Sequence, residues 1–251
     1  MIEATEMTDE QYFAADGLSK SLLAGMDCPD KIGMFKSTPA MLMGTLAHCA
    51  ILEPNEFDKR YIVDPKMPKR SNADKEAWQI WQDENAGKVI ITDEQRDTSM
   101  MMQDAIFNHP KAASLLSGGK AEQAYFWTDE ETGEPCKGKA DYVQGDVIVD
   151  LKTAVSASPS EFSRAVANFK YHWQDAFYSE GTGAEAFYFV VIEKTEPFVI
   201  EVYELSQAAK DKGRKEIHEA KNKYLFHRDF EPYIGYTGSG AITTLDLPKW
   251  A

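Results

Sequence analysis

Residues 137–153 read Lys-Gly-Lys-Ala-Asp-Tyr-Val-Gln-Gly-Asp-Val-Ile-Val-Asp-Leu-Lys-Thr. Two short apolar runs flank Gln144-Gly145-Asp146, which predicts a β-hairpin. Because side chains alternate between the faces of a strand, we expect Asp150 and Lys152 to point the same way and Asp141 to lie opposite Asp150. Two carboxylates suit a hard cation such as Mg²⁺, and an adjacent ammonium can orient a water or screen a developing oxyanion. Hydrolysis of a phosphodiester needs these groups close together, although a surface hairpin with ordinary charges also fits Asp-x-Lys alone.

The rest of the chain predicts an α/β fold with a mixed central sheet flanked by helices and a helical N-terminal annex. Residues 1–118 are expected to be mainly helical, with helices at 18–26, 31–35, 40–52, 74–85 and 93–108 and a loop over 55–70. Residues 119–226 are expected to form the core, with strands at 122–127, 137–143, 147–152, 186–193 and 197–204 and helices at 159–168, 171–181 and 206–224. Residues 227–251 read as irregular. We expect a single domain over 1–251.

Composition narrows the class of protein. The chain has 251 residues, 43% of them hydrophobic and 27% charged, which is typical of a soluble globular protein. It has no apolar run long enough for a membrane span and no signal-peptide pattern at its start, so we expect a cytoplasmic protein with no membrane partner. Three cysteines without a Cys-x-x-Cys pair argue against a disulfide framework or a structural zinc site. The net charge of −14 argues against a protein that coats nucleic acid, but not against a nuclease whose cations line one channel.

Further residues could complete the site. His48 lies in an apolar predicted helix, where a core histidine is common, but a neutral imidazole could also complete a carboxylate metal site. Gly44, one turn earlier, would let that helix approach the sheet closely. Glu122 could be an edge-strand charge or a third carboxylate. Gln174 and Tyr178 share a helix face at i and i+4, and could pack, orient Lys152 or contact DNA.

Two basic stretches are candidates for phosphate contacts. Lys137 and Lys139 lie on the same face of the predicted strand as Asp141. They could form a solvated basic strip or contact phosphate groups. Ser19, Lys20 and Ser21 resemble the start of a helix, which could also receive a terminal phosphate.

These segments together resemble the PD-(D/E)xK nuclease superfamily, and more closely the RecE-like (exodeoxyribonuclease VIII-like) nucleases. The resemblance spans about residues 12–226. It is carried by Tyr12-Phe-Ala-Ala-Asp-Gly-Leu-Ser-Lys-Ser-Leu-Leu, Gly44-Thr-Leu-Ala-His48, Glu122-Gln-Ala-Tyr-Phe-Trp, Cys136-Lys-Gly-Lys-Ala-Asp141, Val149-Asp150-Leu-Lys152-Thr and Tyr171-His-Trp-Gln174-Asp-Ala-Phe-Tyr178. RecE itself has a long N-terminal extension that does not match here, so we expect a counterpart of the catalytic portion alone, from a bacterium or phage.

The resemblance implies an activity and roles for residues. His48, Asp141, Asp150 and the Leu151 carbonyl would hold Mg²⁺, for which Mn²⁺ would substitute. Lys152 would activate the water and Glu122 would assist, while Gln174 and Tyr178 match a Gln-x-x-x-Tyr element. The expected activity is 5′→3′ exonuclease digestion of linear double-stranded DNA, leaving 3′ single-stranded tails for recombination with a RecT-like single-strand annealing protein.

Two other functions stay open at this point, namely an endonuclease of repair or restriction and a non-catalytic DNA-end-binding protein. Digestion polarity, processivity and the number of metal ions are not readable from the residues. A closed ring would keep an acidic subunit on DNA, so we expect a homo-oligomeric trimer or tetramer. Tyr233, Tyr236 and Trp250 could pack on a neighbouring subunit, or the tail could simply cover its own core.

Overall fold

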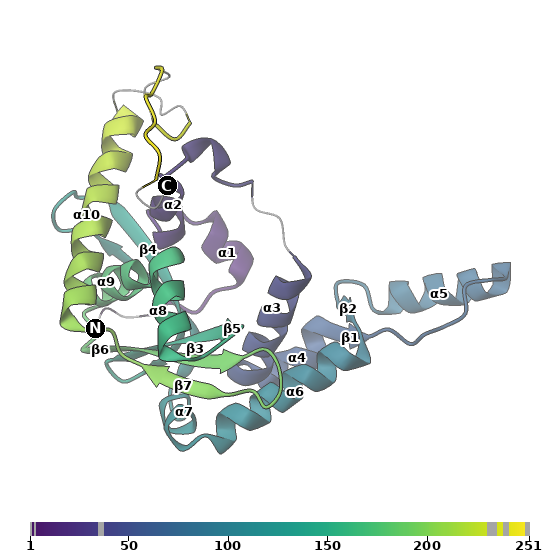
Figure 1. Ribbon diagram of the computed structural model, residues 1–251. Helices are drawn as coiled ribbons and strands as arrows, with labels where there is room; N and C mark the ends of the chain where they lie inside the picture. Colours follow the sequence, from purple (N-terminus) through teal and green to yellow (C-terminus); the bar gives the residue numbers. More distant parts are fainter. Residues whose placement is uncertain (1, 3, 35–37, 230–234, 238–240, 249–251) are drawn as a thin grey trace.

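A five-stranded mixed sheet forms the centre of the protein (Figure 1). The computed structural model describes residues 2, 4–34, 38–229, 235–237 and 241–248. The strands, in spatial order, are β3 (Lys120–Thr128), β4 (Pro135–Gln144), β5 (Val147–Ala154), β6 (Ala186–Glu193) and β7 (Ile200–Tyr203). Only the β5–β6 pair of this sheet is parallel. The predicted mixed α/β architecture is therefore confirmed.

The connections follow from local sequence. Gly145 turns β4 into β5 with a φ of 59°, a conformation that glycine adopts at little cost. The parallel β5–β6 pair needs a long crossover, which α8 (Pro159–Asn168) and α9 (Tyr171–Thr182) supply. Gly183, with a φ of 75°, ends α9 in the left-handed region. The hairpin and both crossover helices lie where the sequence predicts them.

Helices cover both faces of the sheet. Val149 and Leu151 of β5 are fully buried against a layer made by α3 (Pro39–Leu52), α6 (Asp93–Asn108) and α7 (Pro110–Leu115). Ile148 faces the opposite layer, with Phe162 of α8, and α10 (Gln207–Asp229) packs on α9. Each buried aliphatic side chain contributes about 2 kcal/mol to stability. The alternation along β5 directs Asp150 and Lys152 to the side of α8 and α9.

The N-terminal part differs from its prediction in several places. Its elements are α1 (Asp9–Ala14), α2 (Lys20–Gly25), the 3₁₀-helix η1 (Pro29–Lys31), α4 (Pro54–Arg60), β1 (Tyr61–Val63), α5 (Asn72–Glu84) and β2 (Val89–Ile91). The predicted loop over 55–70 is partly wrong, because Pro54 begins α4 as a first-turn proline and does not act as a breaker. α10 continues to Asp229, so residues 227–229 are helical. Helices α1 and α7 and the strands β1 and β2 were not predicted. The helix predicted over 31–35 is wrong in the described part of that range, because residues 32–33 form a turn after η1.

Strands β1 and β2 pair in parallel at the base of an arm that carries α5 away from the body (Figure 1). No helix of the described residues has the length and apolar character of a membrane span.

Candidate active site

Three carboxylates lie on neighbouring strands of the sheet. The pairs Ala121–Tyr142 and Gln123–Ala140 place Glu122 of β3 opposite Asp141 of β4. The β4–β5 pairing runs to Tyr142–Val149, so Asp141 and Asp150 are the next residues along the two strands. There the Asp141 carboxylate accepts a hydrogen bond from the Leu151 N–H at 2.9 Å. The hairpin thus aligns Glu122, Asp141 and Asp150 across β3, β4 and β5.

Glu122 has an unusual backbone for a strand residue. Its φ is 54°, in the left-handed region, which costs a residue other than glycine about 1–2 kcal/mol. Its side chain forms an ion pair with Lys139 at 2.7 Å. Such strain concentrates at functional sites. No feature of the sequence indicates this conformation.

His48 reaches the carboxylates from α3. That helix approaches β5 closely at Gly44, where a Cβ would lie 3.2 Å from the Thr153 hydroxyl. The His48 Nδ1 is 3.8 Å from an Asp141 carboxylate oxygen, and ligand atoms of His48, Glu122 and Asp141 all lie within 4.8 Å of one another. Burial and the nearby Lys152 lower the His48 pKa, which favours the neutral imidazole that can ligate a metal.

Asp150 and Lys152 are held by one glutamine. The Asp150 side chain is buried; one of its oxygens pairs with the Lys152 ammonium, and the other accepts a hydrogen bond from the Gln174 amide. The Gln174 carbonyl oxygen lies 3.4 Å from the Lys152 ammonium, which also lies 4.6 Å from the centroid of the Tyr171 ring. The two ends of Gln174 therefore fix the carboxylate and the ammonium relative to each other.

The acidic groups disfavour one another's charge. Burial, followed by the proximity of Asp150, raises the pKa of Asp141 to about 7. Burial and Asp141 likewise raise the pKa of Glu122. Burial opposes the charge on Lys152, but Asp150 and Asp141 outweigh it and raise the Lys152 pKa, so the ammonium stays protonated. Closely spaced carboxylates with an imidazole nitrogen fit a hard divalent cation, whose charge would relieve this crowding.

Most of the predicted site residues line one pocket of about 590 Å³. They are Ser21, His48, Glu122, Lys139, Asp141, Asp150, Lys152, Gln174 and Tyr178. Arg60 and Lys194 line it as well. Sequence reasoning missed these two cations, because Arg60 was placed in a loop and nothing in the sequence marks Lys194.

Tyr178 contacts the backbone of β4. Its hydroxyl donates to the Lys139 carbonyl at 3.2 Å and lies 3.3 Å from the Lys139 backbone nitrogen. Its ring lies over Gly138, where a Cβ would come within 2.9 Å of a ring carbon. Gly138 therefore allows α9 to approach the strand that carries Asp141. Its role was not predicted, since it depends on a contact across about 40 residues of sequence.

Lys137 corrects the prediction of a basic strip. Its side chain is buried, and its ammonium donates to the carbonyls of Tyr12 at 2.9 Å and Ala15 at 2.6 Å. It therefore holds the end of α1 and does not contact phosphate from the surface. Lys139 does line the pocket, where it pairs with Asp9 and Glu122.

The Ser19–Ser21 stretch begins α2 as predicted. The Ser19 hydroxyl accepts from the Leu22 N–H at 3.2 Å and caps the helix. The Lys20 ammonium donates to the Phe169 carbonyl at 2.8 Å, and burial, then Lys152, lower the Lys20 pKa to about 8. Of the three residues, only Ser21 lines the pocket.

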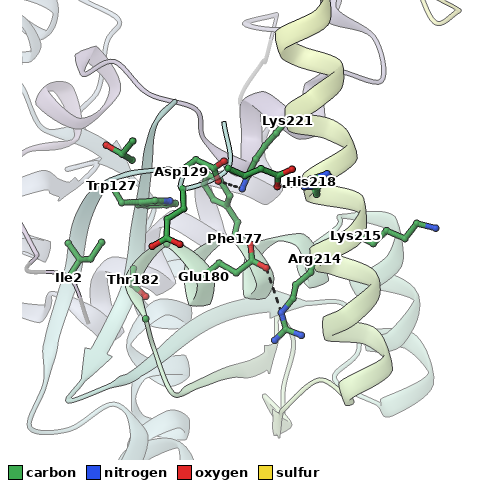
Figure 2. Close-up of a pocket in the computed structure, with 15 residues that line it drawn as sticks. Ile2, Trp127, Asp129, Phe177, Glu180, Thr182, Arg214, Lys215, His218 and Lys221 are labelled. Carbon is green, nitrogen blue, oxygen red and sulfur yellow. Dashed lines mark hydrogen bonds and ion pairs between the residues drawn. The ribbon is translucent and has the colours of Figure 1, made fainter. Parts of the chain in front are cut away.

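A larger pocket of about 830 Å³ lies between the end of β3, α9 and α10 (Figure 2). Three pairs join charged or polar groups across the space: Lys221 with the buried Asp129, Arg214 with Glu180 at 3.6 Å, and the His218 ring with Glu131 at 2.6 Å. Among the described residues that line it, this pairing leaves no cluster of carboxylates for a metal. The smaller pocket, which holds the clustered carboxylates, is therefore the candidate active site.

Comparisons with known proteins agree with this fold. Over 97% of both chains, the structure resembles that of a "Putative exonuclease" from Eubacterium rectale, with a TM-score of 0.65 at 14% identity, which supports the fold alone. A second solved structure, SSO0001, is 15% identical over 74% of this chain and 86% of its own, and its TM-score of 0.33 supports no comparison. No curated protein sequence matches.

Residues 21–232 match the family described as a PDDEXK-like domain of unknown function (DUF3799). That match covers the three carboxylates, His48, Lys152 and Gln174. The predicted membership of the PD-(D/E)xK nuclease superfamily is thereby confirmed, and the chain belongs to this family of PDDEXK-like domains.

Proposed function

We propose that the protein is a Mg²⁺-dependent exonuclease that degrades linear double-stranded DNA 5′→3′ and leaves 3′ single-stranded tails for recombination by strand annealing. One observation carries the nuclease part of this proposal: Asp141, Asp150 and Lys152 lie in one pocket together with Glu122 and His48. The exonuclease description of the Eubacterium rectale protein supports the reaction class. The polarity and the link to recombination rest on the resemblance to RecE-like nucleases.

The residues that would hold Mg²⁺, or Mn²⁺ in its place, are His48, Asp141, Asp150 and the Leu151 carbonyl. Leu151 already contacts two of them, through its N–H to Asp141 and through a backbone hydrogen bond with His48. When bound, the ion would lower the pKa of an attacking water and stabilise charge that develops on the phosphate.

The chain's own groups would complete the reaction. The Lys152 ammonium, kept charged by Asp150 and Asp141, would orient the water and stabilise negative charge on the phosphate. Burial and Asp141 raise the pKa of Glu122, which makes its carboxylate a stronger proton acceptor toward that water. Gln174 and Tyr178 would act as positioning residues, because they fix Asp150, Lys152 and the β4 backbone.

Contacts to the DNA backbone are proposed for Lys139, Ser21 and Lys20, which lie in or beside the pocket. Ser19 would contribute by capping the helix that carries the last two.

Assembly into a trimeric or tetrameric ring, with a RecT-like annealing partner, also belongs to the proposal. A ring would hold a subunit of charge −14 on DNA by topology. Tyr236 contacts Lys31 of its own chain, and Gly235 donates to Asp30 at 2.9 Å, so this part of the tail has contacts within the subunit. Tyr233 and Trp250 lie outside the described residues.

The test uses duplex DNA labelled at its 5′ or 3′ end, in linear and closed circular form, with Mg²⁺ or EDTA. We expect release of 5′-terminal nucleotides from the linear form only, no activity in EDTA, and none for Asp141→Ala. Cleavage of the closed circle would indicate an endonuclease. Binding to ends without cleavage in Mg²⁺ would indicate a non-catalytic protein.

A further inference from the structure

The arm between β1 and β2 buries no side chain. Tyr61 and Ile91 anchor its base among buried residues of α3 and α4, and the register pairs Tyr61 with Val89 and Val63 with Ile91. Every residue from 62 to 90 is exposed or half-buried. In Figure 1 helix α5 is the outermost element of the arm and extends away from the body. The arm is therefore attached to the core without contributing to it.

The hydrogen bonds and ring contacts described for helix α5 join residues that are close in sequence. Its 13 residues are too few for a stable isolated helix in water. A capping box between Ser71 and Asp74 begins it, and Gln79 donates to Asp83 at 2.9 Å along its surface. The helix nevertheless carries two tryptophans and the exposed Ile80. Large aromatic side chains on an element outside the core indicate a binding surface.

The tryptophans form one aromatic face next to a lysine. The rings of Trp78 and Trp81 are stacked with centroids 5.1 Å apart. The Lys69 ammonium lies 3.3 Å from the centroid of Trp78. On a helix of 3.6 residues per turn, Glu76 and Asp83 fall on the side opposite to the tryptophans. These two acidic side chains thus point away from the aromatic face. Asp74, one turn before Trp78, lies on that face, and its carboxylate accepts hydrogen bonds from the Arg70 and Ser71 backbone N–H groups at the start of the helix.

A basic segment joins this face to the active site. Residues 59–71 contain five cations (Lys59, Arg60, Lys66, Lys69 and Arg70) and the single acid Asp64. Three of the cations pair with acids outside the segment, Lys59 with Glu56, Arg60 with Glu53 and Lys66 with Asp93, so Lys69 and Arg70 supply the positive charge beside the tryptophans. Arg60 and Tyr61 line the active-site pocket. The segment therefore begins at the pocket and ends beside the tryptophans. Cations together with stacked aromatics are the features with which proteins bind single-stranded nucleic acid.

We propose that the arm binds the single-stranded DNA that the active site generates, with bases stacked on Trp78 and Trp81 and phosphates against Lys69 and Arg70. This inference rests on the proposed nuclease function, since the strand bound by the arm would be the uncut 3′-ended strand that remains when its complement is digested in the pocket. A second copy of the chain is the competing occupant. The continuity of the basic segment with the pocket favours nucleic acid.

The test measures fluorescence anisotropy of a labelled single-stranded oligodeoxynucleotide of about 20 nucleotides, with the full chain in EDTA. We expect Trp78→Ala/Trp81→Ala to bind at least tenfold more weakly, the loss typical of one base–aromatic stack. Lys69→Gln/Arg70→Gln should also bind more weakly, and should reduce the slope of log affinity against log salt by about 1.4, or ~0.7 for each phosphate that is no longer neutralised. The charge-matched control is Lys111→Gln/Lys215→Gln, on exposed parts of α7 and α10; it should bind within twofold of wild type.

Affinity of both arm variants equal to that of the control would overturn the inference. Sedimentation of each variant identifies the competing occupant: if the tryptophan variant dissociates an oligomer and binds the single strand as tightly as wild type does, the arm is a subunit interface. Because the arm buries nothing, thermal melting of both variants should match wild type. Binding is measured without metal, so its outcome is separate from that of the cleavage assay with Asp141→Ala.

Discussion

Replacing Asp150 by asparagine tests the electrostatic structure of the active site, because it removes one charge and keeps the shape. The carboxamide oxygen of the introduced asparagine can still accept the hydrogen bond from Gln174, while Lys152 loses its pairing with a carboxylate of which only 1% is exposed. Breaking a buried ion pair costs about 3–5 kcal/mol. This is an upper bound, since Asp141 remains close to Lys152.

The same substitution relieves repulsion on Asp141, and this gain depends on pH. In the wild type, burial and Asp150 raise the Asp141 pKa to about 7. A carboxyl whose folded-state pKa is raised stabilises the fold at low pH, and that contribution is lost as the pH rises from about 4 to about 7. At pH 5 Asp141 is protonated, so Asp150→Asn only loses the lysine pair. At pH 8 Asp141 is ionised in the wild type and is repelled by Asp150. The variant lacks this repulsion, which stabilises it by about 1–2 kcal/mol, at ~1.4 kcal/mol per pKa unit.

The assay is thermal unfolding in EDTA at pH 5 and pH 8, for wild type, Asp150→Asn and the exposed control Asp104→Asn. For a chain of this size ~1 kcal/mol corresponds to about 2–4 °C. We expect the deficit in Tm of Asp150→Asn to be smaller at pH 8 than at pH 5 by about 2–8 °C, and the control to show no such change. A deficit that is constant or larger at pH 8 would refute the argument that Asp150 and Asp141 repel each other. In Mg²⁺ at pH 8 the variant should lose cleavage by about 10³-fold or more, several kcal/mol of barrier.

Three further predictions concern neighbouring residues of the site. Lys152→Ala should lose most cleavage activity but still bind Mg²⁺ and DNA, measured by calorimetry and anisotropy; loss of binding with an unchanged kcat would contradict the assignment. His48→Ala should raise the Mg²⁺ concentration for half-maximal activity before it lowers the maximal rate, and a mutant that only melts earlier, with an unchanged Mg²⁺ optimum, would make His48 a core residue. Gly138→Ala should displace Tyr178, lower the free energy of unfolding by about 1–3 kcal/mol in chemical unfolding, and reduce kcat. The comparison for kcat is Gly133→Ala, which lies in an open turn. Equal kcat values for the two variants would show that the contact between Tyr178 and Gly138 does not matter for the site.

The sequence was sufficient for the part of the site that lies within the hairpin. The turn at Gly145 and the alternation along β5 predicted that Asp150 and Lys152 share a face, because both features depend on neighbours in sequence. Placing His48, Gln174 and Tyr178 in the same pocket required the resemblance to known nucleases, since their contacts join elements far apart in the chain.

The failures have physical causes as well. Lys137 has the strand parity of a pocket residue, but α1 lies over that part of β4 and its terminal carbonyls take the ammonium. Pro54 can end one helix or begin the next, and local sequence does not decide between them. The left-handed backbone of Glu122 is imposed by its tertiary surroundings, because its neighbours in sequence have ordinary strand character.

The net charge of −14 was the strongest sequence argument against a protein that acts on DNA. The argument loses force because binding depends on the charges near the site and not on the net charge of the chain. At physiological ionic strength exposed charges are screened beyond about 8 Å, so a phosphate at the pocket responds to the groups beside it and little to the total. Those groups are four cations (Arg60, Lys139, Lys152 and Lys194) and five carboxylates (Asp9, Glu53, Glu122, Asp141 and Asp150), so the pocket is close to neutral, with a net charge of about −1 against −14 for the chain. The carboxylates deep in the pocket are the groups whose charge a divalent cation would offset. The acidic excess of the chain therefore lies largely outside the range that governs binding at this site.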